Sequence, residues 1–477
     1  MSELRDKTVK GVAWSAVDRF ASQGIGFVFS IILARMLMPE DYGTVAITLI
    51  FIALIQVFVD SGFSNALIRK ADRTEQDLST AFYFNIGVGG ACFLLMFALA
   101  PLIALFFDQP VLTDLIRVCS ISIIFNSLCI VQQSLFSIKI DFRTQAVISL
   151  TAVVISGITG ISLAFNGWGV WSLATQNVSY AFLRMTGLWL TSKWRPCKRW
   201  SSASFRYLFG YGSKLLASGL ISTGFNNLYP LVIGKLFPPA ELGLYSRAQG
   251  YAEIPSANVT SVIQRVTFPV LSQMQDDEER LRANYRRLLK TTAFVVFPLM
   301  MGLAAIASPL INWMLTPKWN GCVVYLQILC FAMMLYPIHA INLNLLQVKG
   351  RSDLFLKLEI IKRVLGVVLL IVAFPFGVIG LCWSLVVNSV ICLVINTHYT
   401  GQFIGMGIIR QLKDLLPVLF LSAAMAILAY CATLISDNFS ISALIGLAFG
   451  ITVFILGAKL LHYNELWEVW KFFRSIL

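Results

Sequence analysis

Long apolar stretches alternate with short polar loops along the whole chain. Each stretch is about 20 residues or longer, which is enough for a helix to cross a hydrocarbon layer of about 30 Å. Membrane-spanning backbone must satisfy its own hydrogen bonds, and unbroken apolar runs of this length favour helices over a barrel. Fourteen such segments are predicted: 11–37, 42–61, 78–107, 111–137, 143–166, 168–192, 207–236, 241–270, 290–316, 320–347, 353–375, 377–400, 410–435 and 439–461.

An internal repeat connects the two halves of this pattern. LARMLMPEDYG at 33–43 returns as IGKLFPPAELG at 233–243, which aligns Pro39 with Pro239 and Gly43 with Gly243. SLFSIKIDFR at 134 pairs with NLLQVKGRSD at 344, and WSL occurs at 171 and 383. We interpret the proline motifs as structural, because proline suits the first turn of a helix.

The repeat predicts a domain organisation. A unit of six spans enters the membrane in the same direction twice, so the two copies should be related by a pseudo-two-fold axis along the membrane normal. We therefore expect an all-α polytopic membrane protein with two six-helix bundles and two extra helices. The predicted parts are a first bundle, a basic cytoplasmic linker, a second bundle and a C-terminal part: 1–192, 193–206, 207–400 and 401–477.

Composition and charge agree with a membrane location. Hydrophobic residues make up 57% of the chain and charged residues 13%, more apolar surface than a soluble core could hide. Basic residues gather in one alternate set of loops, while the other set holds only Lys318, so both termini should be cytoplasmic. The excess of 37 basic over 24 acidic residues is then a matter of topology and of attraction to anionic lipid, and nucleic-acid binding is disfavoured. The nine cysteines show no ligand spacing, so no metal site is expected.

Polar residues inside the spans mark the candidate site, because buried charge is costly in a membrane and tends to line a wet pathway. Helical spacing places them as stripes on spans 1, 7 and 8, and the repeat predicts that the stripes of spans 1 and 7 face each other across a cavity. The candidate substrate-binding residues are Arg19, Ser22, Gln23, Lys214, Asn226, Tyr229 and Arg247. The three cations among them suit an anionic cargo. Asp18 and Glu253 are candidates for proton or ion coupling.

The alternative is that these polar groups satisfy one another, for example Asp18 with Arg19. Arg184 is expected to snorkel toward the cytoplasmic surface. The lone His339 is more typical of a hydrogen-bonded core residue than of a proton shuttle. The segment 275–290 predicts an amphipathic connector along the cytoplasmic surface, and 464–477 predicts an interfacial helix.

The chain resembles a known family in its N-terminal run KTVKGVAWSAVDRFASQGIGFVFSIILARMLMPEDYGTVAI, in DSGFSNALIRK and in GVWSL. It is similar to bacterial Wzx-type polysaccharide and oligosaccharide-lipid flippases of the multidrug/oligosaccharidyl-lipid/polysaccharide exporter superfamily, closest to the branch with colanic acid and teichuronic acid exporters. The resemblance implies translocation of undecaprenyl-diphosphate-linked glycan across the bacterial cytoplasmic membrane by alternating access, driven by an ion gradient with H+ and Na+ as candidate ions. It also implies contact with membrane lipids, a monomer, and polysaccharide polymerase machinery as a candidate partner.

Three other functions fit the sequence less well. A multidrug or metabolite exporter would share the fold, but cationic drugs favour a cavity of carboxylates and aromatic rings. A membrane enzyme acting on lipid-linked glycan would need a sizeable outer loop with catalytic groups, and the predicted outer loops are short. A scaffold would not require polar stripes in both halves. No Walker-type loop is present, and we expect neither a cofactor nor an enzymatic activity.

Overall fold

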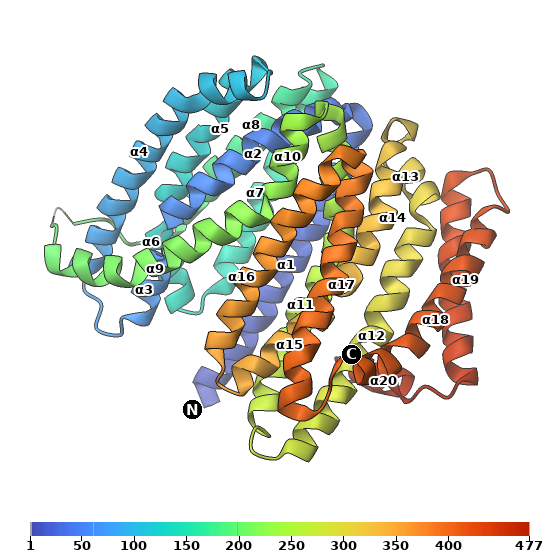
Figure 1. The fold of residues 1–477 in the computed structure, drawn as a ribbon. Coiled ribbons are helices and arrows are strands. Elements are labelled where there is room, and N and C mark those ends of the chain that lie inside the picture. Colours follow the sequence, from blue (N-terminus) through green and yellow to red (C-terminus); the bar gives the residue numbers. More distant parts are fainter. Residues whose placement is uncertain (1, 61, 198, 477) are drawn as a thin grey trace. The chain divides into compact units, whose positions relative to one another are not determined.

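The computed structural model describes residues 2–60, 62–197 and 199–476, and every regular element in these residues is a helix (Figure 1). In chain order the helices are α1 (Ser2–Met36), α2 (Pro39–Asp60), α3 (Phe63–Arg69), α4 (Glu75–Phe106), α5 (Val111–Ser127), α6 (Ile130–Ile138), α7 (Phe142–Phe165), α8 (Val170–Thr191), α9 (Ser202–Asn226), α10 (Leu228–Leu236), α11 (Pro239–Ser272), α12 (Glu278–Ala305), α13 (Ala307–Leu315), η1 (Pro317–Trp319), α14 (Gly321–Met334), α15 (Tyr336–Val348), α16 (Ser352–Ala373), η2 (Phe374–Phe376), α17 (Gly377–Ile404), α18 (Ile408–Thr433), α19 (Phe439–Leu460) and α20 (Asn464–Ile476). Each of the fourteen predicted segments coincides with one helix or two consecutive helices.

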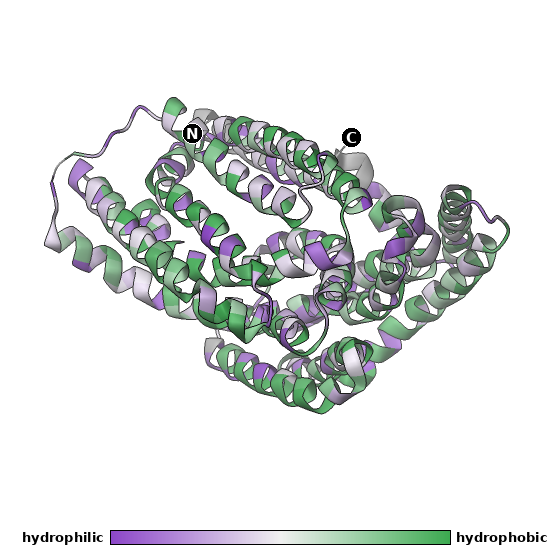
Figure 2. Ribbon diagram, turned by 90° about the horizontal axis from the view of Figure 1, so that it is seen from above, coloured by the Kyte–Doolittle hydropathy of each residue, from purple (hydrophilic) through white to green (hydrophobic). Residues whose placement is uncertain are grey.

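The helices have the length and composition of membrane spans. Among the described residues, nine helical segments are long and apolar enough to cross a membrane, and ten if the bent pair α5 and α6 counts as one span. Helices α9 and α11, which carry two of the predicted polar stripes, are not among them. In Figure 2 hydrophobic residues make up much of the helical ribbon, with hydrophilic residues scattered along the helices and in the connecting segments. The prediction of an all-α polytopic membrane protein is confirmed.

Contacts between residues divide the chain into two compact units, Met1–Gly243 and Leu244–Leu477. In the first unit α7 packs against both α1 and α8, α5 packs against α4 and α8, and α9 contacts α2, α3 and α4. In the second unit α12 packs against α18 and α14, and α17 lies against α14 and α16. The predicted linker and bundle boundaries differ from this division, since α9 begins at Ser202 and belongs with the first unit.

The repeated proline motifs form matching helix starts that touch each other. Both α2 and α11 begin at the proline of their motif. A Cβ atom added to Gly43 would lie 1.8 Å from the carbonyl oxygen of Pro239, and one added to Gly243 would lie 1.9 Å from that of Pro39. Contacts exchanged in this reciprocal way are the mark of a two-fold relation. Only glycine allows the two backbones to approach so closely.

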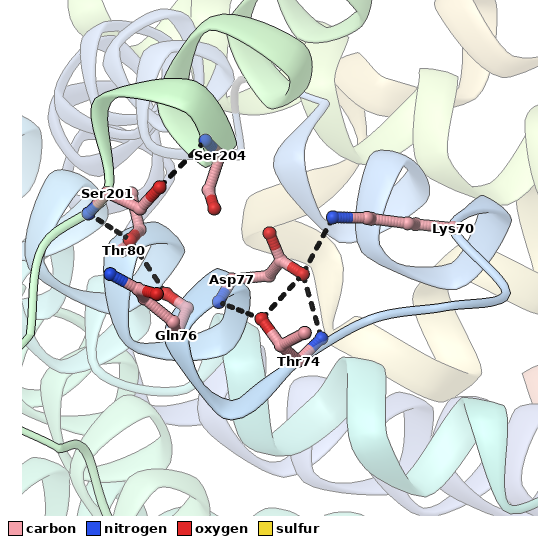
Figure 3. A network of polar contacts seen from close by, with 7 residues as sticks. All are labelled: Lys70, Thr74, Gln76, Asp77, Thr80, Ser201 and Ser204. Atoms are coloured by element: carbon pink, nitrogen blue, oxygen red, sulfur yellow. Dashed lines mark hydrogen bonds and ion pairs between the residues drawn. The ribbon is translucent and has the colours of Figure 1, made fainter.

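The start of α4 is fixed by a polar network (Figure 3). Thr74 and Asp77 form a capping box, in which each side chain binds the backbone amide of the other residue. Asp77 is 1% exposed and accepts a charge-assisted hydrogen bond of 2.8 Å from Lys70. The capped helix end therefore also holds the C-terminal end of α3.

The segment before α9 is tied to the same end of α4. It donates three hydrogen bonds to α4: Trp194 Nε1 to Glu75 Oε2, Cys197 N to Ser79 Oγ, and Ser201 N to Thr80 Oγ1. Ser201 then caps α9 by accepting a bond from the amide of Ser204. The linker is thus an ordered strap in the described residues rather than a loose tether.

The amphipathic connector predicted at 275–290 is continuous with the following span, because α12 runs without interruption from Glu278 to Ala305; its place along the cytoplasmic surface stays a prediction. Its amphipathic pattern is confirmed: Leu281 and Tyr285 are fully buried. The Tyr285 hydroxyl donates to Asn342 Oδ1 at 2.9 Å and accepts from Gln411 Nε2 at 3.1 Å. These buried hydrogen bonds pack this part of α12 against α15 and α18.

Two further side chains settle minor predictions. His339 contacts Ser389 Oγ at 3.1 Å and Asn396 Nδ2 at 3.4 Å, which confirms a hydrogen-bonded core residue. At the C-terminus, Glu468 of α20 pairs with Arg287 of α12 at 2.6 Å, while Trp467 and Trp470 remain exposed. The helix is present as predicted, and its location at the membrane interface stays a prediction.

Candidate substrate cavity

A bend in the fourth predicted span builds one wall of a cavity. Helices α5 and α6 meet at an angle of 41° across Leu128 and Cys129. The break frees backbone carbonyls, and the indole Nε1 of Trp189 donates to that of Leu128 at 3.0 Å. With the carbonyl satisfied, the bent span can present Asn126 and Gln133 to a shared space.

The junction of α2 and α3 forms another part of the lining. Gly62 has a φ of 70°, in the left-handed region that glycine adopts at little cost. A Cβ at this position would also lie 2.9 Å from Gly212 Cα on α9. The glycine therefore lets α9 approach closely, and Asp60 of α2 and Asn65 of α3 line the same space. An apolar cluster that includes Phe63, Leu67 and Leu208 packs α3 against α9.

These residues line a partly open cavity of about 700 Å³ within the first unit. Its lining residues come from α2, α3, α5, α6, α8, α9 and the turns between them: Gln56, Val57, Asp60, Gly62, Ser64, Asn65, Asn126, Cys129, Ile130, Gln133, Arg184, Leu215, Leu216, Ser218 and Gly219. Amides dominate the polar part, with one carboxylate and one guanidinium. Functional pockets typically measure about 300–1,000 Å³ and orient their ligands with a few polar groups.

Hydrogen bonds orient the lining side chains. Asn126 Nδ2 donates to Gln56 Oε1 at 3.1 Å, and Gln56 Nε2 donates to Asp60 Oδ1 at 3.1 Å. The chain links α5 to α2 and fixes which end of the Gln56 amide accepts. Arg184 of α8 contributes the guanidinium of the lining.

The residues predicted from sequence lie elsewhere. None of the nine candidate side chains is part of this cavity lining. On α1, Arg19 is exposed and Asp18 is half-buried, accepting a hydrogen bond of 3.2 Å from Ser22. The other α1 candidate, Gln23, is half-buried. On α9, Lys214 is exposed.

The remaining candidates are spread over α9, α10 and α11. Asn226 is exposed at the end of α9, and Tyr229 is buried in α10. Arg247 is half-buried and Glu253 exposed, both in the second unit. Whether the predicted stripes face each other stays a prediction.

Sequence reasoning overlooked the amides of span 4 as candidates. Arg184, for which snorkelling toward the cytoplasmic surface stays a prediction, lines the cavity together with Asp60 and Gln56. The available signal was Asn126 and Gln133, two amides seven residues apart within one predicted span. The bend between them and the turn at Gly62 left no comparable signal.

The helical fold is shared with solved structures of membrane transporters. The solved structure of the lipid II flippase MurJ in an inward closed conformation matches with a TM-score of 0.78, covering 95% of this chain and 100% of that one at 17% identity. An inward-facing multidrug resistance MATE family transporter of the MOP superfamily matches with a TM-score of 0.61, over 80% and 94% of the two chains at 15% identity. The chain therefore has the fold shared by these exporters.

Sequence comparison identifies the family. The profile of the polysaccharide biosynthesis protein family matches residues 32–324, and the chain belongs to this family. The lipopolysaccharide biosynthesis protein WzxC of Escherichia coli is 26% identical over 397 residues, covering 82% of this chain and 80% of WzxC. The teichuronic acid biosynthesis protein TuaB of Bacillus subtilis is 24% identical over 455 residues, covering 94% of each chain. The resemblance drawn from the sequence is confirmed.

Proposed function

We propose that the protein translocates undecaprenyl-diphosphate-linked oligosaccharide from the inner to the outer leaflet of the bacterial cytoplasmic membrane. Its membership in the polysaccharide biosynthesis family carries the proposal. The relatives are named for lipopolysaccharide and teichuronic acid biosynthesis, and the MurJ structure that shares the fold is a lipid II flippase. The names of the two relatives share the biosynthesis of a polysaccharide, and the name of the solved structure adds the flipping of a lipid.

Alternating access is the proposed mechanism. A chain with a six-span repeat can expose one site to either side of the membrane by movement of its repeats. The reciprocal contact of Gly43 and Gly243 supports this reading, because it joins the two copies of the repeat motif at a single close-packed point. In this proposal the contact is made in one state of the cycle and separates in the other.

Binding of the diphosphate is assigned to the cations of the polar stripes. Arg19 and Lys214 are exposed on α1 and α9, and Arg247 is half-buried on α11. Guanidinium and ammonium groups bind phosphate oxygens by charge-assisted hydrogen bonds. Ser22, Gln23, Asn226 and Tyr229 are the polar groups proposed to accompany them.

Energy is proposed to come from an ion gradient. Asp18 and Glu253 are the candidate coupling carboxylates, with H+ or Na+ as the ion. The hydrogen bond from Ser22 supports a role for the Asp18 carboxylate, because it holds the side chain in a defined orientation within the span. The protein is proposed to act as a monomer with both termini in the cytoplasm, and polysaccharide polymerase machinery is its candidate partner.

Leaflet-resolved accumulation of lipid-linked glycan in cells lacking the protein tests the function. We expect undecaprenyl-diphosphate-linked glycan to accumulate in the inner leaflet, and wild type to clear it. Complementation with Arg19→Ala or Lys214→Ala should leave the accumulation in place. Normal clearance without the protein would contradict the proposal and favour an exporter of drugs or metabolites.

A further inference from the structure

The cavity of the first unit has a lining whose chemistry differs from that of the cationic stripes. Its ionisable side chains of opposite charge, Asp60 and Arg184, balance one another. The other polar groups that could contact a ligand are mainly neutral amides, such as Gln56, Asn126 and Gln133. A diphosphate carries several negative charges and requires more than one cation, so this lining does not suit it.

The same lining suits a ligand with many hydroxyl groups. A carboxamide offers two donors and a carbonyl acceptor, so it can bind a hydroxyl that donates and a neighbour that accepts. Gln56 is held between Asn126 and Asp60, which leaves Asp60 Oδ2 and Asn126 Oδ1 to accept from the ligand. Arg184 supplies up to five N–H donors on the facing side.

Apolar side chains alternate with these polar groups. Val57, Ile130 and Leu215 contribute hydrocarbon surface from three different helices. A sugar ring has the same two-sided character, since its hydroxyls project from a ring with C–H faces. A space of about 700 Å³ is the size of an oligosaccharide of a few rings.

The cavity lies next to Lys214, one of the cations proposed to bind the diphosphate. Ser218 lines the cavity, and Lys214 precedes it on α9 by four residues, which is one helical turn on the same face. The separation along the helix axis is therefore about 6 Å. A diphosphate bound at Lys214 can pass its first sugar directly into the cavity.

We propose that this cavity is a subsite for the glycan of the lipid-linked cargo, with Asp60, Arg184 and the amides of Gln56, Asn126 and Gln133 as its sugar-binding groups. The assignment rests on the proposed function and deepens it by separating two tasks. The cations of the stripes bind the diphosphate common to all such carriers. The cavity binds the sugar residues, so it determines which glycan is transported.

Binding measurements on the purified full-length protein test this division. Three probes are used: undecaprenyl diphosphate, the lipid-linked glycan that accumulates in cells lacking the protein, and the same glycan released from its lipid by mild acid. Wild type should bind both glycan probes. Asp60→Asn should weaken binding of both glycan probes by about 10- to 100-fold, and binding of undecaprenyl diphosphate by less than about 2-fold.

A second variant makes the test independent of any one substitution. Ser218→Phe fills the cavity from α9 and should produce the same selective loss, whereas Arg206→Gln, an exposed cation on α9 outside the lining, should behave as wild type. Thermal unfolding of each variant checks that it is folded. Unchanged glycan binding in both folded cavity variants would overturn the assignment, and so would an equal loss of undecaprenyl diphosphate.

The proposed function fails by a different result. If wild type binds neither lipid probe and cells without it clear the lipid-linked glycan normally, the cargo itself is wrong. If wild type clears the glycan and both Asp60→Asn and Ser218→Phe bind all three probes as wild type does, the flippase function stands and only the sugar subsite is overturned.

Discussion

Replacing Gly43 with alanine should separate the two helix starts that the repeat brings together. The added Cβ would lie 1.8 Å from the carbonyl oxygen of Pro239, and real contacts of this kind essentially never fall below 3.0 Å. The clash is with backbone, so no side-chain rotation can relieve it, and the ends of α2 and α11 must move apart by about 1 Å or more. Overpacking of this kind costs about 1–3 kcal/mol. That cost shifts the equilibrium from the closed to the separated contact by about 5- to 140-fold.

Spin labels at Met38 and Pro238 measure the effect. Both positions are exposed, and they are equivalent in the repeat. In a background without native cysteines, Gly43→Ala should increase the mean distance between the labels and reduce clearance of lipid-linked glycan in cells. Gly243→Ala should do the same, because the contact is reciprocal.

Gly90→Ala provides the control, since a Cβ at Gly90 would meet no atom within 4 Å. It should change neither the distance nor the clearance. If Gly43→Ala gave the same distance distribution and the same clearance as Gly90→Ala, the contact would have no part in closing the protein, and the reasoning from the repeat would be refuted.

Three further substitutions test the packing through thermal unfolding of the purified protein. The side chain of Asp414 is 4% exposed and accepts two hydrogen bonds of 2.6 Å from Arg286. Asp414→Asn should therefore lower the free energy of unfolding by about 1.5–3 kcal/mol. An unchanged free energy of unfolding would mean that the ion pair does not stabilise the protein. Among the described residues neither amide atom of the fully buried Gln132 has a hydrogen-bond partner. Gln132→Leu should therefore raise the free energy of unfolding by about 1–2 kcal/mol. A lower free energy of unfolding would indicate that an internal water is the partner of Gln132. Asp77→Ala removes the capping box and the bond from Lys70, and should cost about 1–3 kcal/mol; stability equal to wild type would show that the network in Figure 3 is dispensable.

The fold was largely predictable because the membrane imposes a simple rule on sequence. Apolar runs of spanning length predict helices, and the fourteen predicted segments all coincide with helices. Breaks inside a span are harder to predict, because they depend on tertiary partners. The bend at Leu128 is stabilised by the indole of Trp189, which lies 61 residues away in the sequence.

The site was less predictable for the same reason. Helical periodicity groups residues on one helix, but it does not say which helices meet. Gln56 and Asp60 lie on α2, whereas their partner Asn126 comes from α5, so periodicity along one helix does not connect them. A cation within a few turns of a span end can snorkel or turn inward, and only packing decides between the two, so the sequence did not predict that Arg184 lines the cavity.

The repeat shows what sequence similarity can establish in such a chain. The pairing of Pro39 with Pro239 and of Gly43 with Gly243 was read from two short motifs 200 residues apart. It predicted equivalent helix starts, and the structure confirms them. It did not predict that the motifs touch, because a duplication fixes equivalence and leaves distance open.

The most direct test of the central claim is translocation by the purified protein in sealed vesicles. Lipid-linked glycan extracted from cells lacking the protein is placed in one leaflet, and its appearance in the other is followed under an imposed H+ or Na+ gradient. The account predicts gradient-dependent translocation by wild type, strongly reduced rates for Lys214→Ala, and none in vesicles without protein. Equal rates with and without the protein, under both gradients, would contradict the account.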